Sequence, residues 1–346
     1  MSTNRTAART SAVLLAFLLA ACGGGNDSGS TGPTPGPGGS SQTGISGAQG
    51  SGGGLATAAP TPNYAQGSEE LAAFQFLNAE RGRCGFGVLA QNTKLDAAAR
   101  AHADYQLVND LFTHTEDRAV YPSGFTGTTM VDRFAFQQYT DMGGAVDEIT
   151  GETGRDDKTG FGVEGIRNLL NAPYHLQGLM SGMREAGVAV RSSRDTGTLT
   201  PRVLLQWDGA YTLQAGPQLL ASNDVLTYPC EGTTGADRQL TNESPDPVPG
   251  RDLTMNPLGT SVYIATRPGN TLAVTAASMT NTRTGGRVAL RAAITAANDP
   301  QRSYGANEAY VAADAPLDAN TAYEVTVAGT NNGAAFTRTF RFTTGP

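Results

Sequence analysis

A long stretch that cannot fold on its own limits where this chain can build a core. From Gly23 to about Pro62 the sequence consists almost wholly of Gly, Ser, Thr, Pro, Ala and Gln. Such a composition buries too little apolar surface to offset the entropy lost on ordering. We therefore expect residues 22–62 to form a disordered linker and the folded part of the 346-residue chain to begin at residue 63.

The residues before this stretch have the layout of an export signal. Arg5 and Arg9 precede an apolar run over residues 12–21, and Cys22 follows directly. The run is about ten residues long, whereas a helix that spans a membrane needs about twenty. We therefore interpret residues 1–21 as a signal peptide rather than as a membrane span.

The junction Leu19-Ala20-Ala21-Cys22 resembles the lipobox of bacterial lipoproteins. The resemblance implies that a diacylglyceryl group, with acyl chains such as palmitate, is transferred to the Cys22 sulfur and that the chain is cut in front of it. The mature protein would then be anchored to a bacterial membrane and face the periplasm or the cell surface. The alternative is an ordinary secretory signal followed by an incidental cysteine.

The charge of the chain excludes one class of partner. Its formal net charge is −7, and its Lys and Arg residues are scattered rather than clustered. A protein that binds nucleic acid needs a basic patch that faces the phosphates. We therefore expect no nucleic-acid partner.

Two cysteines remain once Cys22 carries a lipid. Cys84 and Cys230 form an even pair in an exported chain, which predicts a disulfide. If they pair, closing a loop of about 146 residues could stabilise the fold by up to ~5 kcal/mol. A reactive cysteine nucleophile is the alternative.

A second break divides the folded part. Residues 242–250 contain Pro245, Pro247 and Pro249, which forbid a continuous helix or strand ladder. We therefore expect a first domain over residues 63–235, a Pro-rich linker over 236–250 and a second domain over 251–346.

The first domain reads as helices followed by strands. Ser68-Glu69-Glu70 predicts the start of a helix that stops near Gly82, because Ser caps a helix and acidic residues favour its first turn. Apolar spacing predicts a second helix from about residue 92, and a third covers 163–170. Segments 185–190 and 202–207 are rich in β-formers and flank a turn at 195–197. This order predicts an α+β layered domain.

The second domain reads as all-β. Short segments rich in β-formers lie at 272–274, 288–290, 323–327 and 336–342, with a turn at Asn332-Gly333 between the last two. Apolar and polar residues alternate in 323–327. Alternation gives each strand one buried face, as a β-sandwich requires. Residues 317–344 resemble the end of bacterial Ig-like domains, which implies an Ig-like sandwich.

The chain has three histidines. His102 lies on the apolar stripe of the second helix, where a hydrogen-bonded core histidine is more common than a ligand. His114 falls in a polar loop after that helix, and His175 lies between the third helix and the first strand. Loops on a rigid scaffold commonly carry functional sites, so His114 and His175 are the candidates.

Several fragments together resemble the CAP superfamily, also called the SCP or cysteine-rich secretory type. They are Leu77-Asn78-Ala79-Glu80-Arg81, Phe112-Thr113-His114, Pro173-Tyr174-His175 and Glu185-Ala186-Gly187-Val188, within residues 68–210. The resemblance implies an α-β-α sandwich with two histidines and two acidic residues facing an open cavity.

Three positions match that family's site residues. His114 matches the first histidine, His175 the second, and Glu148 the first glutamate. The Asn that usually follows this glutamate is Ile149 here. The second acidic residue has no match, and Glu164 is the nearest candidate.

These residues leave the chemistry open. Two neutral imidazoles and one carboxylate, from His114, His175 and Glu148, could hold Zn²⁺ with one position free. Zn²⁺ is therefore the cofactor to test, and the alternative has the same side chains hydrogen-bonded to one another to hold two segments together.

The favoured function is that of a non-enzymatic binding module. The resemblance implies a cavity that takes an apolar small molecule or an extracellular protein partner. A metal-assisted hydrolase with His114 or His175 as general base beside Glu148 is one alternative. The chain has neither a G-x-S-x-G nor an H-E-x-x-H motif, which disfavours an esterase or a zinc protease. An adhesive or structural surface lipoprotein is the other alternative.

Overall fold

The structure is a computed structural model that describes residues 54–346. The expected signal peptide, Cys22 and most of the expected linker lie outside the described residues. Within the described residues, no helix is long and apolar enough to cross a membrane. All described residues belong to one compact unit.

The first sheet, sheet A, has four strands in the order β1-β3-β4-β2. These strands are β1 (Ala90–Gln91), β2 (Met142–Thr153), β3 (Glu185–Ser192) and β4 (Arg202–Thr212). Strand β4 pairs antiparallel with both β3 and β2, and β1 pairs parallel with β3. Strand β2 is therefore an edge strand whose outer side is free to meet other groups.

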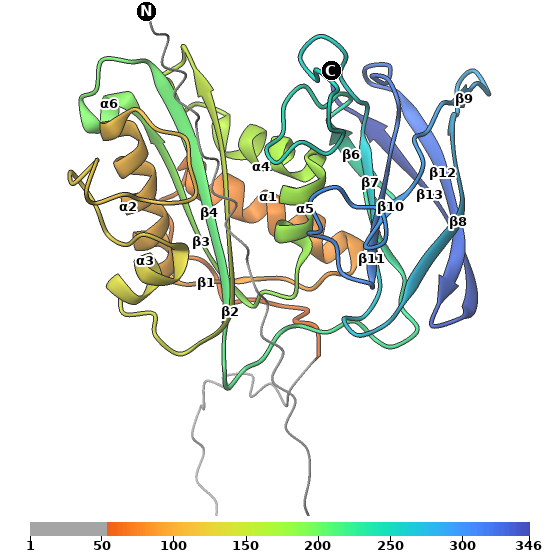
Figure 1. Cartoon of the computed structure of the whole chain (residues 1–346), viewed down its shortest axis with the longest axis horizontal. Coiled ribbons are helices and arrows are strands. Elements are labelled where there is room, and N and C mark those ends of the chain that lie inside the picture. Colours follow the sequence, from red (N-terminus) through yellow and green to blue (C-terminus); the bar gives the residue numbers. More distant parts are fainter. Residues whose placement is uncertain (1–53) are drawn as a thin grey trace, which may run out of the picture. The chain divides into compact units, whose positions relative to one another are not determined.

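Helices cover both faces of sheet A (Figure 1). One face carries α2 (Thr93–Asn109) and α3 (Met130–Phe136), and the other carries α1 (Glu69–Cys84), α4 (Phe161–Asn171) and α5 (Pro173–Met180). A short helix, α6 (Ser193–Thr196), lies where the sequence predicts a turn. The α+β fold class with helices on both sides of a sheet is confirmed.

Local signals place α1 where the sequence predicts it. The Ser68 side chain accepts a hydrogen bond from the Leu71 amide at 3.2 Å, and Glu69 and Glu70 occupy the first turn. Gly85 closes the helix with φ 84°, a conformation that glycine adopts without strain.

The C-terminal part is a β-sandwich of two sheets, as expected. Sheet B has the order β10-β11-β7-β5, and sheet C has the order β6-β13-β12-β8-β9. The strands of sheet B are β5 (Leu226–Tyr228), β7 (Ser261–Ala265), β10 (Ile294–Thr295) and β11 (Glu308–Ala312). Those of sheet C are β6 (Thr233–Ala236), β8 (Leu272–Asn281), β9 (Arg287–Val288), β12 (Ala322–Asn331) and β13 (Ala334–Thr344). Asn332 and Gly333, both with positive φ, form the expected turn between β12 and β13.

The sheets do not follow the expected domain boundaries. Strands β5 and β6 include residues before 235, yet β5 pairs with β7 and β6 pairs with β13. Leu240, within the expected linker 236–250, forms a β-bridge with Leu258. The segment that joins the two parts is therefore built into the sandwich.

Sheet B is buried on both faces. On β7, Tyr263 joins the core formed by α1, α4, α5 and sheet A, whereas Val262 and Ile264 join the core between sheets B and C. Successive residues of a strand point to opposite faces, so each side of β7 packs against a different layer. The helical part and the β-sandwich thus share one continuous core.

The expected disulfide is confirmed. Cys84 at the end of α1 is bonded to Cys230 between β5 and β6, with Cα atoms 5.5 Å apart. The bond ties the first helix of the helical part to the sandwich across a sequence separation of 146 residues.

We expect reduction of this disulfide to lower the free energy of unfolding by about 2–5 kcal/mol, because the unfolded chain regains the freedom of a long loop. Urea unfolding of the purified chain with and without a reductant measures the change. In a Cys84→Ser/Cys230→Ser variant, the reductant should have no effect. Identical unfolding curves for the reduced and oxidised wild-type chain would contradict this role.

Candidate functional site

The site is built around two neighbouring acidic residues on edge strand β2. Because Asp147 and Glu148 are consecutive in a strand, their side chains point to opposite faces of sheet A. Asp147 meets Arg133 of α3, with its Oδ2 2.7 Å from Arg133 Nη2. Glu148 meets α5, where a Cβ added at Gly178 would lie 1.8 Å from Glu148 Oε1. Gly178 therefore leaves the space that the Glu148 carboxylate needs.

His114 lies on the Asp147 side of the strand, in the loop after α2 where the sequence places it. Its Nδ1 is 3.3 Å from Asp147 Oδ2. Arg133, which is fully buried, holds both residues: its Nη1 donates to the His114 carbonyl at 2.9 Å while its Nη2 donates to Asp147. This guanidinium fixes the loop and orients the carboxylate that faces the ring.

His175 lies on the Glu148 side of the strand. The sequence predicts a loop at this position, but the structure has a helix there. The residue belongs to the short helix α5, which begins at Pro173. Proline suits the first position of a helix because the amide it lacks would have no partner there. His175 Nε2 is 3.8 Å from Glu148 Oε2, and His175 Nδ1 is 3.5 Å from Glu243 Oε1.

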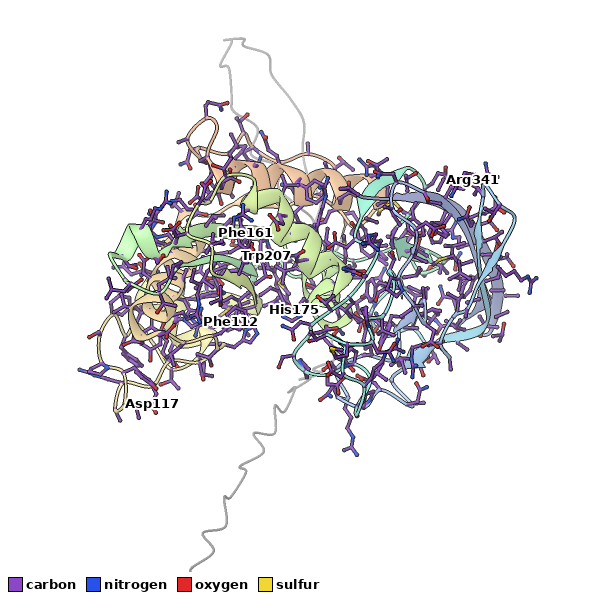
Figure 2. All side chains as sticks on the ribbon, turned by 90° about the horizontal axis from the view of Figure 1, so that it is seen from above. Phe112, Asp117, Phe161, His175, Trp207 and Arg341 are labelled. Atoms are coloured by element: carbon purple, nitrogen blue, oxygen red, sulfur yellow. A yellow bond between two sulfur atoms is a disulfide. The ribbon has the colours of Figure 1, made fainter. Side chains whose placement is uncertain are left out.

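The two imidazoles lie side by side although they are distant in sequence. The centroids of the His114 and His175 rings are 6.4 Å apart, with 37° between their planes. The His114 side chain is 45% exposed and that of His175 is 11% exposed. In Figure 2, His175 is labelled beside helix α5. The structure thus brings together His114, Glu148 and His175, the three residues that the sequence predicts as a site.

The carboxylates of this cluster have different electrostatic surroundings. Burial disfavours the ionised form of Asp147, but His114 and Arg133 outweigh it and lower the pKa of this carboxyl. Burial raises the pKa of Glu148 well above its usual value, and the neighbouring Asp147 and Glu243 carboxylates raise it further. Burial also raises the pKa of Glu243, an effect that His175 partly offsets.

Two members of the cluster lie at positions that no local sequence pattern marks. Glu243 comes from the connecting segment, and Arg133 lies on α3, neither of which has a motif at that position. Glu164, the nearest candidate for a second acidic residue, is not in the cluster: it lies on α4 and pairs with Arg155 at 2.8 Å.

His102 is the hydrogen-bonded core histidine that the sequence predicts. Its Nδ1 is 2.9 Å from Glu116 Oε1, its Nε2 is 2.9 Å from the Thr113 carbonyl, and the residue is fully buried. These contacts use both ring nitrogens. His102 therefore holds the loop that carries His114 and is not part of the site.

The expected zinc ligands do not assemble as a metal centre. Within residues 54–346, no group of three or more His, Cys, Asp or Glu side chains has the arrangement that a metal ion needs. Each candidate imidazole instead directs its Nδ1 toward a carboxylate, Asp147 for His114 and Glu243 for His175.

A separate hollow opens at one end of sheet A. Its volume is about 470 Å³, and polar side chains dominate its lining. The lining residues are Gln91, Asn92, Thr93, Lys94, Gln138, Tyr139, Thr140, Asp141, Glu185 and Thr212. His114, Glu148 and His175 do not line it, so it is distinct from the histidine cluster.

Comparison with known proteins leaves the family open. No protein-family model matches the chain, and no curated protein matches it. An outer surface protein from Borrelia burgdorferi is 14% identical, with a TM-score of 0.32, over 43% of this chain and 96% of that one. An extracellular protein containing an SCP domain from Bacillus anthracis is 18% identical, with a TM-score of 0.30, over 40% of this chain and 39% of that one. Scores this low do not establish a shared family.

We expect the Glu148→Gln variant to melt at a higher temperature than the wild type at pH 7. A carboxyl whose pKa is raised by folding destabilises the folded state as the pH rises above the value in the unfolded chain, about 4.3. Glutamine has nearly the same shape and removes this cost. The melting temperatures of the variant and of the wild type, measured from pH 4 to pH 8, should become equal near pH 4. A variant that melts lower than the wild type at pH 7 would contradict this assignment.

Proposed function

We propose that this chain is an extracytoplasmic, lipid-anchored protein that binds a ligand at the His114–His175 cluster and does not catalyse a reaction. The observation that carries the proposal is the pair of imidazoles 6.4 Å apart, one half exposed and one largely buried. A partly exposed ring can meet a ligand, whereas the buried ring and its carboxylates give the site a fixed shape. Polar groups held in advance in this way are typical of binding sites.

The contacts of the rings support binding rather than catalysis. Each ring faces carboxylates: Asp147 for His114, and Glu148 and Glu243 for His175. A hydrolase that acts through a side-chain nucleophile needs its base within hydrogen-bond reach of a hydroxyl or thiol. The contacts instead keep the imidazoles in place as donors or acceptors for a bound molecule.

The proposed location rests on the N-terminal sequence and on the disulfide. The lipobox-like junction at Cys22 predicts a membrane anchor. The Cys84–Cys230 bond is of the kind that persists in oxidising compartments outside the cytoplasm. The ligand that we propose is an apolar small molecule with a polar group at the imidazoles, or an extracellular protein that presents such a group.

A zinc-dependent hydrolase is the competing proposal. Its support is that both Nδ1 atoms face carboxylates, which is how proteins commonly orient histidines that bind metal through the other nitrogen. The missing convergence of three ligands within residues 54–346 weighs against it.

Extraction of the ligand from the native lipoprotein tests the proposal. We expect mass spectrometry of the purified wild-type chain to detect a compound that is lost from a His114→Ala/His175→Ala variant with an unchanged circular dichroism spectrum. A Glu164→Gln variant is the control, because Glu164 lies outside the cluster. The same compounds in all three preparations would contradict binding at this cluster.

The same preparations separate the hydrolase from the binding protein. They are assayed with peptide, ester and phosphodiester substrates, with and without added Zn²⁺. If the wild type turns over one of these substrates and His114→Ala does not, the chain is an enzyme and the binding proposal is wrong.

A further inference from the structure

Helix α5, which carries His175, has no N-terminal cap of its own. Its N-cap residue is Ala172, whose side chain cannot accept a hydrogen bond, and Pro173 occupies the first position. The first amide that needs a partner, that of Tyr174, donates to Glu243 Oε1 at 2.7 Å. A residue 69 positions along the chain therefore supplies the cap.

The Glu243 carboxylate also faces the imidazole ring of His175. Glu243 Oε1 lies 3.5 Å from His175 Nδ1, and the Glu243 side chain is fully buried. Within residues 54–346, Glu243 Oε2 and His175 Nδ1 are buried without a hydrogen-bond partner. A buried carboxylate with an unsatisfied oxygen is costly, so its presence beside an imidazole calls for a functional reason.

His175 is thus placed between two carboxylates. Its Nε2 is 3.8 Å from Glu148 Oε2 on one side, and its Nδ1 is 3.5 Å from Glu243 on the other. Both distances exceed the ~2.7–3.2 Å of a good hydrogen bond, so a small shift of the ring would form either bond. Contacts of this kind commonly tighten when a ligand binds.

The β-sandwich fixes the segment that carries Glu243. The Gln301 side chain donates to the Asp246 carbonyl at 2.8 Å, and the Tyr310 hydroxyl donates to the Pro247 carbonyl at 3.3 Å. The sandwich also holds α5 itself, because the Tyr304 hydroxyl donates to the Pro173 carbonyl at 2.7 Å. Both partners of the Glu243–His175 contact are therefore held by β11 and by the segment that connects β10 to it.

We propose that Glu243 is a positioning residue of the binding site: it sets the orientation of the His175 ring and which ring nitrogen carries a proton. The site is then composite, with His114, Glu148 and His175 from the helical part and Glu243 from the segment fixed by the β-sandwich. A carboxylate at one ring nitrogen favours a proton there and so determines what the other nitrogen offers to a ligand. That these residues bind a ligand rests on the proposed function, whereas the positioning role does not.

The test uses the full chain, with its histidines labelled with ¹⁵N. Three histidines give three sets of ring signals, and His114→Ala and His175→Ala variants assign them. In a Glu243→Gln variant the amide oxygen can still accept from the Tyr174 amide, so the cap is kept while the negative charge is lost. We expect the His175 ring signals to shift more than those of His114 or His102.

Two controls separate positioning from a general disturbance of the helix. Asp299→Asn changes a residue that accepts from the Tyr174 hydroxyl at 2.6 Å and so contacts α5 without touching the His175 ring. Glu164→Gln changes an exposed carboxylate outside the cluster. Both should leave the His175 signals nearer to their wild-type positions than Glu243→Gln does.

Unchanged His175 signals in Glu243→Gln, or an equal shift in Asp299→Asn, would overturn the proposal and leave Glu243 as a helix cap alone. Because the ring signals are compared for each variant whether or not it yields an extracted compound, this result is independent of the extraction experiment. A shifted His175 signal with no extracted ligand would keep the positioning role and contradict the proposed function.

Discussion

The packing of helices α1, α4 and α5 between sheets A and B is the interaction on which the rest of the structure depends. One apolar core runs from Val188 and Trp207 of sheet A, through the helices, to Tyr263 and Tyr310 of sheet B. Burial of apolar surface is the main favourable contribution to folding, so layers that share a core stabilise one another. The Cys84–Cys230 bond reinforces the same junction.

Tyrosine side chains with hydrogen-bonded hydroxyls determine how α5 packs against the β-sandwich. Tyr174 of α5 packs against Tyr304 with ring centroids 5.8 Å apart, and Tyr304 packs against Tyr310 at 5.4 Å. Their hydroxyls reach specific acceptors, such as Asp299 for Tyr174 and the Pro173 carbonyl for Tyr304. Aromatic residues of this kind combine a large buried surface with a directional hydrogen bond. The position of α5, and with it that of His175, is thus set from the side of the β-sandwich.

Strand β2 determines how the two histidines are held. Because Asp147 and Glu148 point to opposite faces, one strand supplies a carboxylate to a ring on each side. Their surroundings differ: Arg133 contacts Asp147 directly, whereas Glu148 is near the Asp147 and Glu243 carboxylates. The site therefore combines a readily ionised acid with one that resists ionisation.

Local patterns in the sequence predict much of this fold. The capping Ser68 and the alternation in 323–327 reflect forces that act over a few residues, and the structure has α1 and β12 at these positions. Strand β2 is missed because its sequence, with glycines at 143, 144 and 151 and several acidic residues, has low β-propensity and is ordered by pairing with β4. Helix α5 is missed because the third helix predicted from the sequence ends at residue 170, whereas Pro173 begins a separate short helix.

The candidate site, like the fold, is predicted from the sequence only in part. The resemblance to a known family picks out His114, Glu148 and His175, and the structure brings them together. Glu243 and Arg133 act through contacts with residues far away in sequence, which no local pattern records. The sheets cross the expected domain boundary at residue 235 for the same reason. Strands β5 and β6 are ordered by pairing with β7 and β13, which lie later in the chain.

Differential scanning calorimetry of the purified chain tests most directly the claim that the helical part and the β-sandwich are one unit. A shared core predicts a single unfolding transition for residues 54–346, with a calorimetric enthalpy equal to the van't Hoff enthalpy. Two separate transitions, one for the helical part and one for the β-sandwich, would contradict the account.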